Sequence, residues 1–148
     1  MASYRAIGGL ITTPTVTESL IHVTGGTGGR LKWTEAIMGS QAAPVEQTSE
    51  FRGYRSTGTG ATGTVETEFQ NDPADVAPAG VALSDLTAEP TGKVYGLAFP
   101  LHQRGTFRWV ANPGEEIIVA ATANHAFGME FTATTSAYVS RCCVGWHE

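Results

Sequence analysis

The first residues with a spacing that could form a ligand-binding site are glycines. Residues 58–63 read Gly-Thr-Gly-Ala-Thr-Gly and match the G-x-G-x-x-G pattern of dinucleotide-binding loops. In those loops the glycines lie between a strand and a helix N-terminus, which holds the pyrophosphate. Here a segment rich in Val, Thr and Phe follows, which is typical of a strand. The pattern therefore predicts a turn between two strands rather than a nucleotide site.

A second phosphate-loop pattern is incomplete. Gly92-Lys93 has the end of such a loop, but Val94 stands where Ser or Thr would coordinate magnesium, and Thr87 replaces the first glycine. The histidines also lack a metal-binding arrangement, because the chain has no His-x-His or His-Glu-x-x-His motif. We therefore predict no bound cofactor and no metal site, and isolated positions for His22, His102, His125 and His147.

Glu35 is the carboxylate whose position is most suggestive of catalysis. By strict alternation it shares an apolar strand face with Trp33 and Ile37, where it would be desolvated as the acid of a glycosidase is. A glycosidase needs a second carboxylate at a defined separation, and the sequence does not identify one. A β-bulge that turns Glu35 outward is the simpler interpretation.

Tryptophans and an acidic segment offer two binding hypotheses. Trp33, Trp109 and Trp146 could form a platform for sugar stacking, but burial in the core or in a subunit interface is favoured for aromatic side chains on apolar strand faces. Residues 71–75, Asn-Asp-Pro-Ala-Asp, contain oxygen ligands without the spacing of a calcium loop. A turn is the favoured interpretation of this segment.

The two cysteines, Cys142 and Cys143, are adjacent. Neighbouring Cα atoms are about 3.8 Å apart, shorter than the roughly 4.4–6.8 Å of a disulfide, and alternate side chains of a strand point to opposite faces. We expect two free thiols, with Cys142 in the core and Cys143 facing outward, as in a protein made in a reducing cytosol.

Composition excludes several classes of function. The net charge is −5 and no run of cations is present, which argues against nucleic-acid binding. No stretch approaches eighteen apolar residues, and the first residues lack the apolar segment of a signal peptide, so neither a membrane span nor secretion is expected. Charged residues make up 16% of the chain, below the usual quarter. A β-rich composition explains this low fraction, and burial of surface in an assembly is the alternative.

Alternation of apolar and polar residues predicts an all-β chain of one domain. Eight or nine strands at spacings of about 8–14 residues indicate an antiparallel, jelly-roll-like β-sandwich, with an immunoglobulin-like sandwich as the second choice. A hairpin is expected to join residues 45–55 to residues 64–70. We predict a core formed by Leu31, Trp33, Val65, Phe69, Leu97, Phe99, Trp109, Ile117, Val119, Phe127, Met129, Phe131, Val144 and Trp146.

Two segments are candidates for contacts with other molecules. Residues 1–18 are weakly patterned and predict an N-terminal arm or edge strand ahead of a sandwich domain at 19–148, so that deleting residues 1–12 should leave the sandwich folded. Residues 71–93 are long for a loop, with a possible helical turn at residues 81–86. Apolar and acidic residues of these segments form the predicted interface: Tyr4, Ile7, Leu10, Ile11, Asp75, Val81 and Leu86.

Several short motifs give the chain a resemblance to a known group. These motifs are Arg30–Trp33, Leu86–Gly92, Phe107-Arg-Trp109, Pro113–Val119 and the ending Trp146-His-Glu148. They resemble small β-rich proteins encoded in the structural modules of tailed bacteriophages. The resemblance implies a capsid decoration or cement protein on the outer surface of the virion, synthesised in the host cytoplasm. Its expected partners are the major capsid protein and copies of itself, with a trimer favoured.

The sequence thus predicts a non-enzymatic virion protein with no catalytic residues, because no nucleophile, metal or acid–base constellation is complete. Two alternatives remain open. One is a carbohydrate-binding or depolymerising module of a phage tail or fibre, with Glu35 and the tryptophans at a sugar site. The other is a minor capsid or tail structural subunit.

Overall fold

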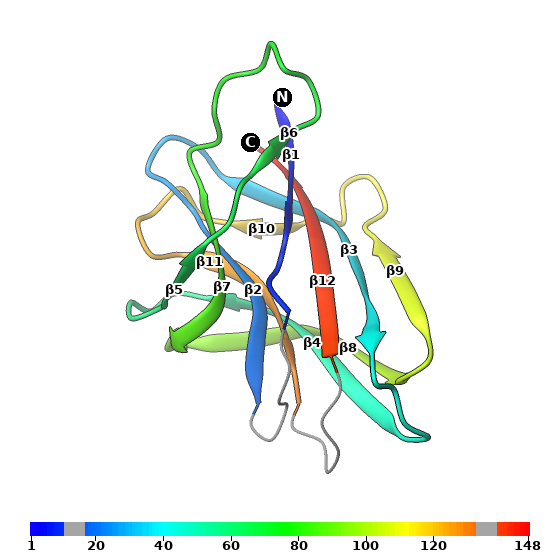
Figure 1. Ribbon diagram of the computed structural model, residues 1–148. Coiled ribbons are helices and arrows are strands. Elements are labelled where there is room, and N and C mark those ends of the chain that lie inside the picture. Colours follow the sequence, from blue (N-terminus) through cyan, green and yellow to red (C-terminus); the bar gives the residue numbers. More distant parts are fainter. Residues whose placement is uncertain (11–16, 133–138) are drawn as a thin grey trace.

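The described part of the chain is a sandwich of two antiparallel sheets (Figure 1). The computed structural model describes residues 1–10, 17–132 and 139–148, and these contain no helix. Sheet A consists of β1 (Ser3–Ile7), β3 (Leu31–Ala42), β6 (Phe69–Gln70), β9 (Thr106–Val110), β10 (Ile117–Val119) and β12 (Val139–His147). Sheet B consists of β2 (Glu18–Thr24), β4 (Thr48–Ser56), β5 (Thr62–Val65), β7 (Val81–Ala88), β8 (Lys93–His102) and β11 (Ala126–Phe131).

Eight of these strands have the connectivity of a jelly roll. They lie in the order β1-β12-β3-β9 in sheet A and β2-β11-β4-β8 in sheet B. Successive strands of the eight alternate between the sheets except for β4 and β8, which pair within sheet B, as in a double Greek key. The remaining four extend the sheets: β5, β6 and β7 are inserted between β4 and β8, and β10 lies between β9 and β11. The predicted all-β, jelly-roll-like sandwich is therefore confirmed, although the described residues form twelve strands rather than the eight or nine expected.

The core is continuous between the two sheets. Trp33 stacks on Phe127 with ring centroids 5.0 Å apart, and Tyr4 packs against Trp146 at 5.8 Å. Eight predicted core residues are buried: Leu31, Trp33, Val119, Phe127, Met129, Phe131, Val144 and Trp146. Four more pack against the core while partly buried: Leu97, Phe99, Trp109 and Ile117. Sequence patterning missed Leu20, Ile21, Val23, Met38 and Phe51, which are also buried.

The prediction of a single strand at residues 64–70 was wrong, because this segment contributes to two strands in different sheets. These residues do not form one strand paired with residues 45–55, because the chain leaves sheet B after β5 and joins sheet A at β6. Val65 and Phe69 are exposed rather than buried, at 67% and 66% of their surface. The reason is that the polar side chains turn inward: Glu68 accepts a hydrogen bond from the Ala82 amide at 2.8 Å, and Glu66 accepts one from Ser84.

Residues 81–86 form the first part of β7 and not a helical turn. Along this strand the alternate side chains of Ala82, Ser84 and Leu86 are buried, the period of a half-buried strand. The long segment between residues 71 and 93 is thus mostly a strand with a shorter loop before it.

The first strand belongs to the core. β1 lies between β12 and β6, with Tyr4 opposite Trp146 and Ala6 opposite Val144. Tyr4 and Ala6 are completely or almost completely buried, so the interpretation of this segment as too weakly patterned for the core was wrong. Two alternating inward residues are too few to stand out in a five-residue strand.

Candidate functional site

A β-bulge places Glu35 on the outer face of sheet A. The pairing of β3 with β12 runs from Gly145 opposite Glu35 to Trp146 opposite Trp33, which leaves Thr34 as the extra residue. The alternation therefore shifts, so that Trp33 stays in the core while Glu35 points away from it. The predicted outward turn of Glu35 is confirmed.

Two arginines hold Glu35 from opposite sides. Arg5 on β1 reaches across Gly145 to Glu35 Oε2 at 3.0 Å, and Arg108 on β9 donates to Oε1. A side chain at position 145 would meet Glu35, so the glycine keeps this path open. With both oxygens bound to arginines, Glu35 organises the outer face of the sheet rather than acting as one of a carboxylate pair.

Around this ion pair the outer face of sheet A is uncovered in the described chain. We call the docking face the outward side chains Arg5, Ile7, Phe69, Lys32, Glu35, Ile37, Arg108, Val110, Arg141 and Cys143. Ile7, Phe69 and Val110 expose 54%, 66% and 52% of their surfaces. Apolar side chains that remain in contact with water at this level, around arginines, are a feature of interaction surfaces.

The predicted interface residues do not all lie together. Ile7 belongs to the docking face, and Leu10 and Val81 are exposed elsewhere. Tyr4 and Leu86 are buried within the fold, and Asp75 is partly buried. Ile11 lies outside the described residues.

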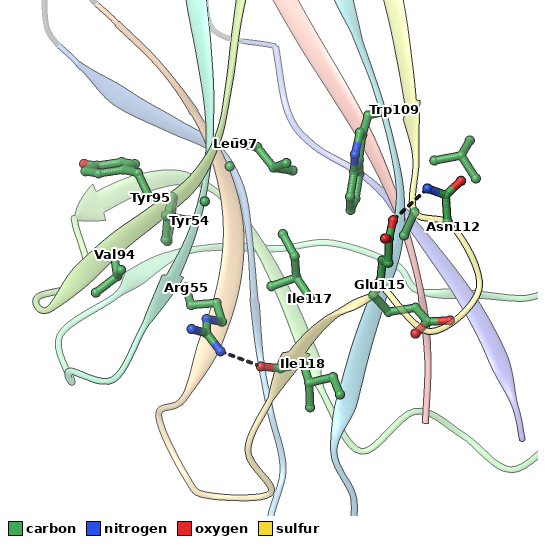
Figure 2. Close-up of a pocket in the computed structure, with 15 residues that line it drawn as sticks. Tyr54, Arg55, Val94, Tyr95, Leu97, Trp109, Asn112, Glu115, Ile117 and Ile118 are labelled. Carbon is green, nitrogen blue, oxygen red and sulfur yellow. Dashed lines mark hydrogen bonds between the residues drawn. The ribbon is translucent and has the colours of Figure 1, made fainter.

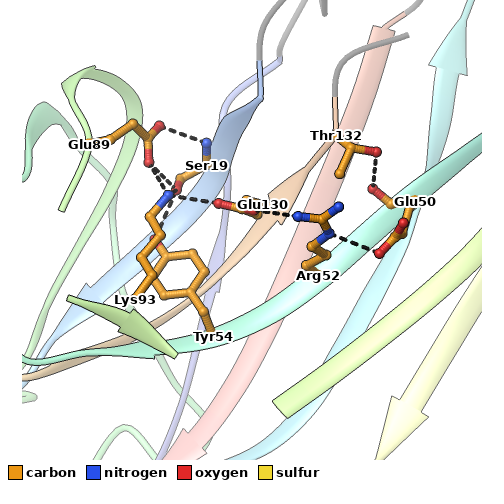
Figure 3. A network of polar contacts seen from close by, with 8 residues as sticks. All are labelled: Ser19, Glu50, Arg52, Tyr54, Glu89, Lys93, Glu130 and Thr132. Carbon is orange, nitrogen blue, oxygen red and sulfur yellow. Dashed lines mark hydrogen bonds and ion pairs between the residues drawn. The ribbon is translucent and has the colours of Figure 1, made fainter. Parts of the chain in front are cut away.

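A buried polar cluster covers part of the outer face of sheet B (Figure 3). Glu130 on β11 is fully buried and accepts a hydrogen bond from Lys93 Nζ at 2.7 Å, while the same ammonium donates to Glu89 at 2.6 Å. Glu89 in turn accepts hydrogen bonds from the Ser19 amide and hydroxyl at 2.8 and 2.6 Å. Lys93 also lies 4.7 Å from the ring centre of Tyr54, within range of a cation–π contact.

The protonation states of this cluster argue against catalysis by Ser19. Burial alone would lower the pKa of Lys93, but its bonds to Glu130 and Glu89 raise it above the usual range. Burial would raise the pKa of Glu89, but its bonds from Lys93 and Ser19 lower it. Lys93 is therefore a permanent cation at neutral pH and cannot accept the Ser19 proton, as a base would have to. The geometry is that of a structural salt-bridge network.

Tyr54 and His22 extend the cluster toward β2. Tyr54 lies over Gly128, where any Cβ would come within 2.5 Å of its ring, and its hydroxyl is 2.9 Å from Ser19 Oγ and 3.0 Å from His22 Nδ1. Burial lowers the pKa of His22 to about 4; the charge of Glu89 opposes this shift and the charge of Lys93 adds to it, both by smaller amounts. His22 is thus neutral at physiological pH.

The glycine-rich and acidic segments considered as binding sites in the sequence form turns. Residues 57–61 connect two strands, β4 and β5, and no helix follows them, so the predicted turn is confirmed. In the segment 71–75, Asp72 accepts a hydrogen bond from the Ala74 amide at 2.9 Å, which closes a turn. Within the described residues no three His, Cys, Asp or Glu side chains gather into a possible metal site.

The cysteines lie on opposite faces of β12, as expected. Cys142 is buried in the core and Cys143 is half-buried on the docking face, and both are free. Burial raises the pKa of both thiols, which disfavours the reactive thiolate.

A cleft opens where the edges of the two sheets meet (Figure 2). It has a volume of about 650 Å³ and lies between β4 and β8 of sheet B and the β9–β10 segment of sheet A. Leu97, Trp109 and Ile117 face one another across it, and Asn112 and Glu115 stand at one rim. At the other end Arg55 donates a hydrogen bond to the Ile118 carbonyl at 3.1 Å.

A glycine lines the cleft at a β-bulge. In the pairing of β4 with β8, Gly53 opposes Leu97 and Tyr54 opposes Tyr95, so Gly96 is the extra residue of a bulge. A Cβ at position 96 would approach Ile117 Cδ1 at 3.9 Å across the cleft. An isolated glycine within a strand pattern is the signal in the sequence that could have indicated this bulge.

The three tryptophans do not form one platform. Trp33 and Trp146 are completely buried, whereas Trp109 is partly exposed in the cleft and meets Trp33 edge to face at 5.2 Å.

Comparison of the chain with protein-family models, curated proteins and solved structures finds no match. Within the described residues no helix is long and apolar enough to cross a membrane.

Proposed function

We propose that this chain is a non-enzymatic structural protein of a tailed-phage virion, a capsid decoration or cement subunit that attaches through the docking face. The observation that carries the proposal is that, in the described part of the chain, the outer face of sheet A exposes the apolar side chains of Ile7, Phe69 and Val110. Leaving apolar surface in water costs about 25 cal/mol per Å², a cost that disappears when a partner covers the face.

The charge of the docking face indicates the kind of partner. Arg5, Lys32, Arg108 and Arg141 lie on it, and Glu35 is the carboxylate among them, although the whole chain has a net charge of −5. A cationic face on an acidic protein suits an acidic partner surface, because opposite potentials steer association and fix orientation. Arginine is also enriched among residues that contribute most to binding.

The sequence motifs point to a viral shell as that partner. The resemblance of Leu86–Gly92, Phe107–Trp109 and Pro113–Val119 to structural-module proteins of tailed phages supports attachment to the major capsid protein. A subunit bound across shell proteins stabilises the assembled form by mass action, since it binds the assembled state and not the dissociated one. A trimer, matching threefold positions of a shell, is part of the proposal.

Binding of purified chain to undecorated phage heads tests this proposal. Ile7→Asp and Arg141→Glu each change an exposed side chain of the docking face and should weaken binding at least tenfold, or by about 1.4 kcal/mol. Val65→Asp and Arg104→Glu are matched controls at exposed positions outside the docking face, and should bind as the unmodified chain does. Equal losses in the controls, or none in the face variants, would contradict the proposal.

A further inference from the structure

We propose that the cleft between β8 and the β9–β10 segment binds a neutral oligosaccharide, independently of the docking face. The cleft combines an apolar floor with a small number of fixed polar groups, and its volume of about 650 Å³ lies within the usual range for ligand sites. It lies at the β8–β9 edge of the sandwich and shares Val110 with the docking face, which is the outer surface of sheet A.

The floor of the cleft presents the indole of Trp109, and Tyr54 and Tyr95 also line the cleft. Trp109 is partly exposed there, whereas Trp33 and Trp146 are fully buried. Its contact with Trp33 fixes the indole edge to face at an interplanar angle of 64°. Figure 2 shows the indole standing opposite Leu97 and Ile117. A rigid indole in such a position can stack against the C–H face of a pyranose ring and contributes apolar contact at little entropic cost.

The rim of the cleft offers hydrogen-bond acceptors and donors in fixed positions. Asn112 Nδ2 donates to Glu115 Oε2 at 2.6 Å, and both Glu116 oxygens accept from the Gly114 amide at about 3.1 Å. Hydrogen bonding to backbone amides lowers the pKa of Glu116. The remaining lone pairs of these carboxylates accept hydrogen bonds from hydroxyl groups, and the Asn112 carbonyl accepts another.

The cleft carries charges of both signs. Glu115 and Glu116 would repel an anion at one end, while Arg55 keeps its positive charge at the other end, where it donates to the Ile118 carbonyl. Charges of opposite sign at the two ends favour a ligand without net charge. A second cleft of about 530 Å³ shares Arg55, Val94 and Ile118 with the first. The two clefts adjoin at these residues, and Arg30 and His125 also line the second one. Two adjoining clefts suit a linear chain of sugars rather than a compact ligand.

Titration of the chain with linear neutral hexasaccharides tests this inference. The probes are α-1,4-glucose, β-1,4-glucose and β-1,4-N-acetylglucosamine oligomers, with a sulfated heparin hexasaccharide as the anionic counterpart. Tryptophan fluorescence and calorimetry are the readouts. Because Trp109 is the one partly exposed tryptophan of the three, which all lie in the described chain, a fluorescence change reports on the cleft.

The decisive variant is Gly96→Leu, which fills the cleft from the bulge. The space at position 96 is open apart from Ile117, so this variant should fold. We expect it to lose binding, and Asn112→Ala to weaken binding about tenfold, as loss of a well-placed hydrogen-bond partner does. Phe69→Ala removes an exposed aromatic side chain outside the cleft and should bind normally.

Three results would overturn the inference: no binding of any neutral hexasaccharide at about 10 mM, where even a millimolar site would be filled, binding of the sulfated probe alone, or full binding by Gly96→Leu. Head binding by the same variants separates the two proposals, because Gly96→Leu leaves the docking face intact.

Discussion

Lys93 connects the polar side chains of the buried cluster on the outer face of sheet B. Its ammonium bonds Glu89 and the fully buried Glu130, and lies over the Tyr54 ring. A buried carboxylate that loses its cation is strongly destabilising, because its desolvation is no longer compensated. Removing Lys93 should therefore destabilise the fold mainly by leaving the buried Glu130 carboxylate without its cation.

Lys93→Met should reduce the free energy of unfolding by about 3 kcal/mol or more, measured by urea denaturation at neutral pH. Lys32→Met is the matched control, because Lys32 is the other lysine of the chain and lies on the docking face. The control should change stability by less than about 0.5 kcal/mol. Similar losses in both variants would contradict a stabilising role for the Lys93 network.

Protonation of His22 should make the free energy of unfolding decrease as the pH falls. Its pKa is about 4 in the folded chain and about 6.5 when unfolded, so the unfolded chain binds more protons between these values. The free energy of unfolding should fall as pH drops from 6.5 toward 4, by up to about 3 kcal/mol at 1.36 kcal/mol per pKa unit. In His22→Gln the fall over this interval should be smaller, and denaturation curves of both proteins from pH 7 to 4.5 measure the difference. Parallel curves would show that His22 is not responsible.

At the scale of elements, β1 closes sheet A over the core. It pairs with β12 along its whole length, and Tyr4 covers Trp146. Its loss would expose these aromatic side chains and leave the backbone of β12 without a partner on that side. Replacing one buried aromatic by alanine typically costs 3–5 kcal/mol, and a domain of this size has about 5–15 kcal/mol in total.

Deletion of residues 1–7 should therefore abolish cooperative unfolding, as followed by circular dichroism and near-ultraviolet signal on heating. The variant Ile7→Ser, which changes the exposed end of the same strand, should unfold cooperatively near the unmodified chain. A truncated chain that retains a sharp transition would show that β1 is dispensable for the fold.

The sequence predicted elements well where alternation was long and failed where strands were short. The β11 residues Phe127, Met129 and Phe131 are buried as the alternation indicates. β5 and β6 were merged because four-residue and two-residue strands cannot show a change of sheet. The Lys93 cluster could not be predicted either, since Ser19, Glu89 and Glu130 come from three distant parts of the chain.

At the scale of the whole molecule, the outer faces of the two sheets differ in the side chains that they carry. The outer face of sheet B carries the buried polar cluster around Lys93, whereas the outer face of sheet A combines arginines with exposed apolar side chains. This asymmetry is the physical basis for placing the shell contact on sheet A and the oligosaccharide at the β8–β9 edge. Fold class followed from the sequence, but which face is left uncovered depends on long-range pairing that alternation does not specify.

The proposal that this chain is a decoration subunit of a phage head is tested most directly by quantitative mass spectrometry of virions purified from a tailed phage whose genome carries this sequence. A decoration subunit should be present at a copy number comparable to that of the major capsid protein, and should co-purify with heads separated from tails. A few copies per particle, or enrichment with tails, would instead indicate a minor capsid or tail subunit. Absence of the chain from purified virions would contradict a structural role in the particle altogether.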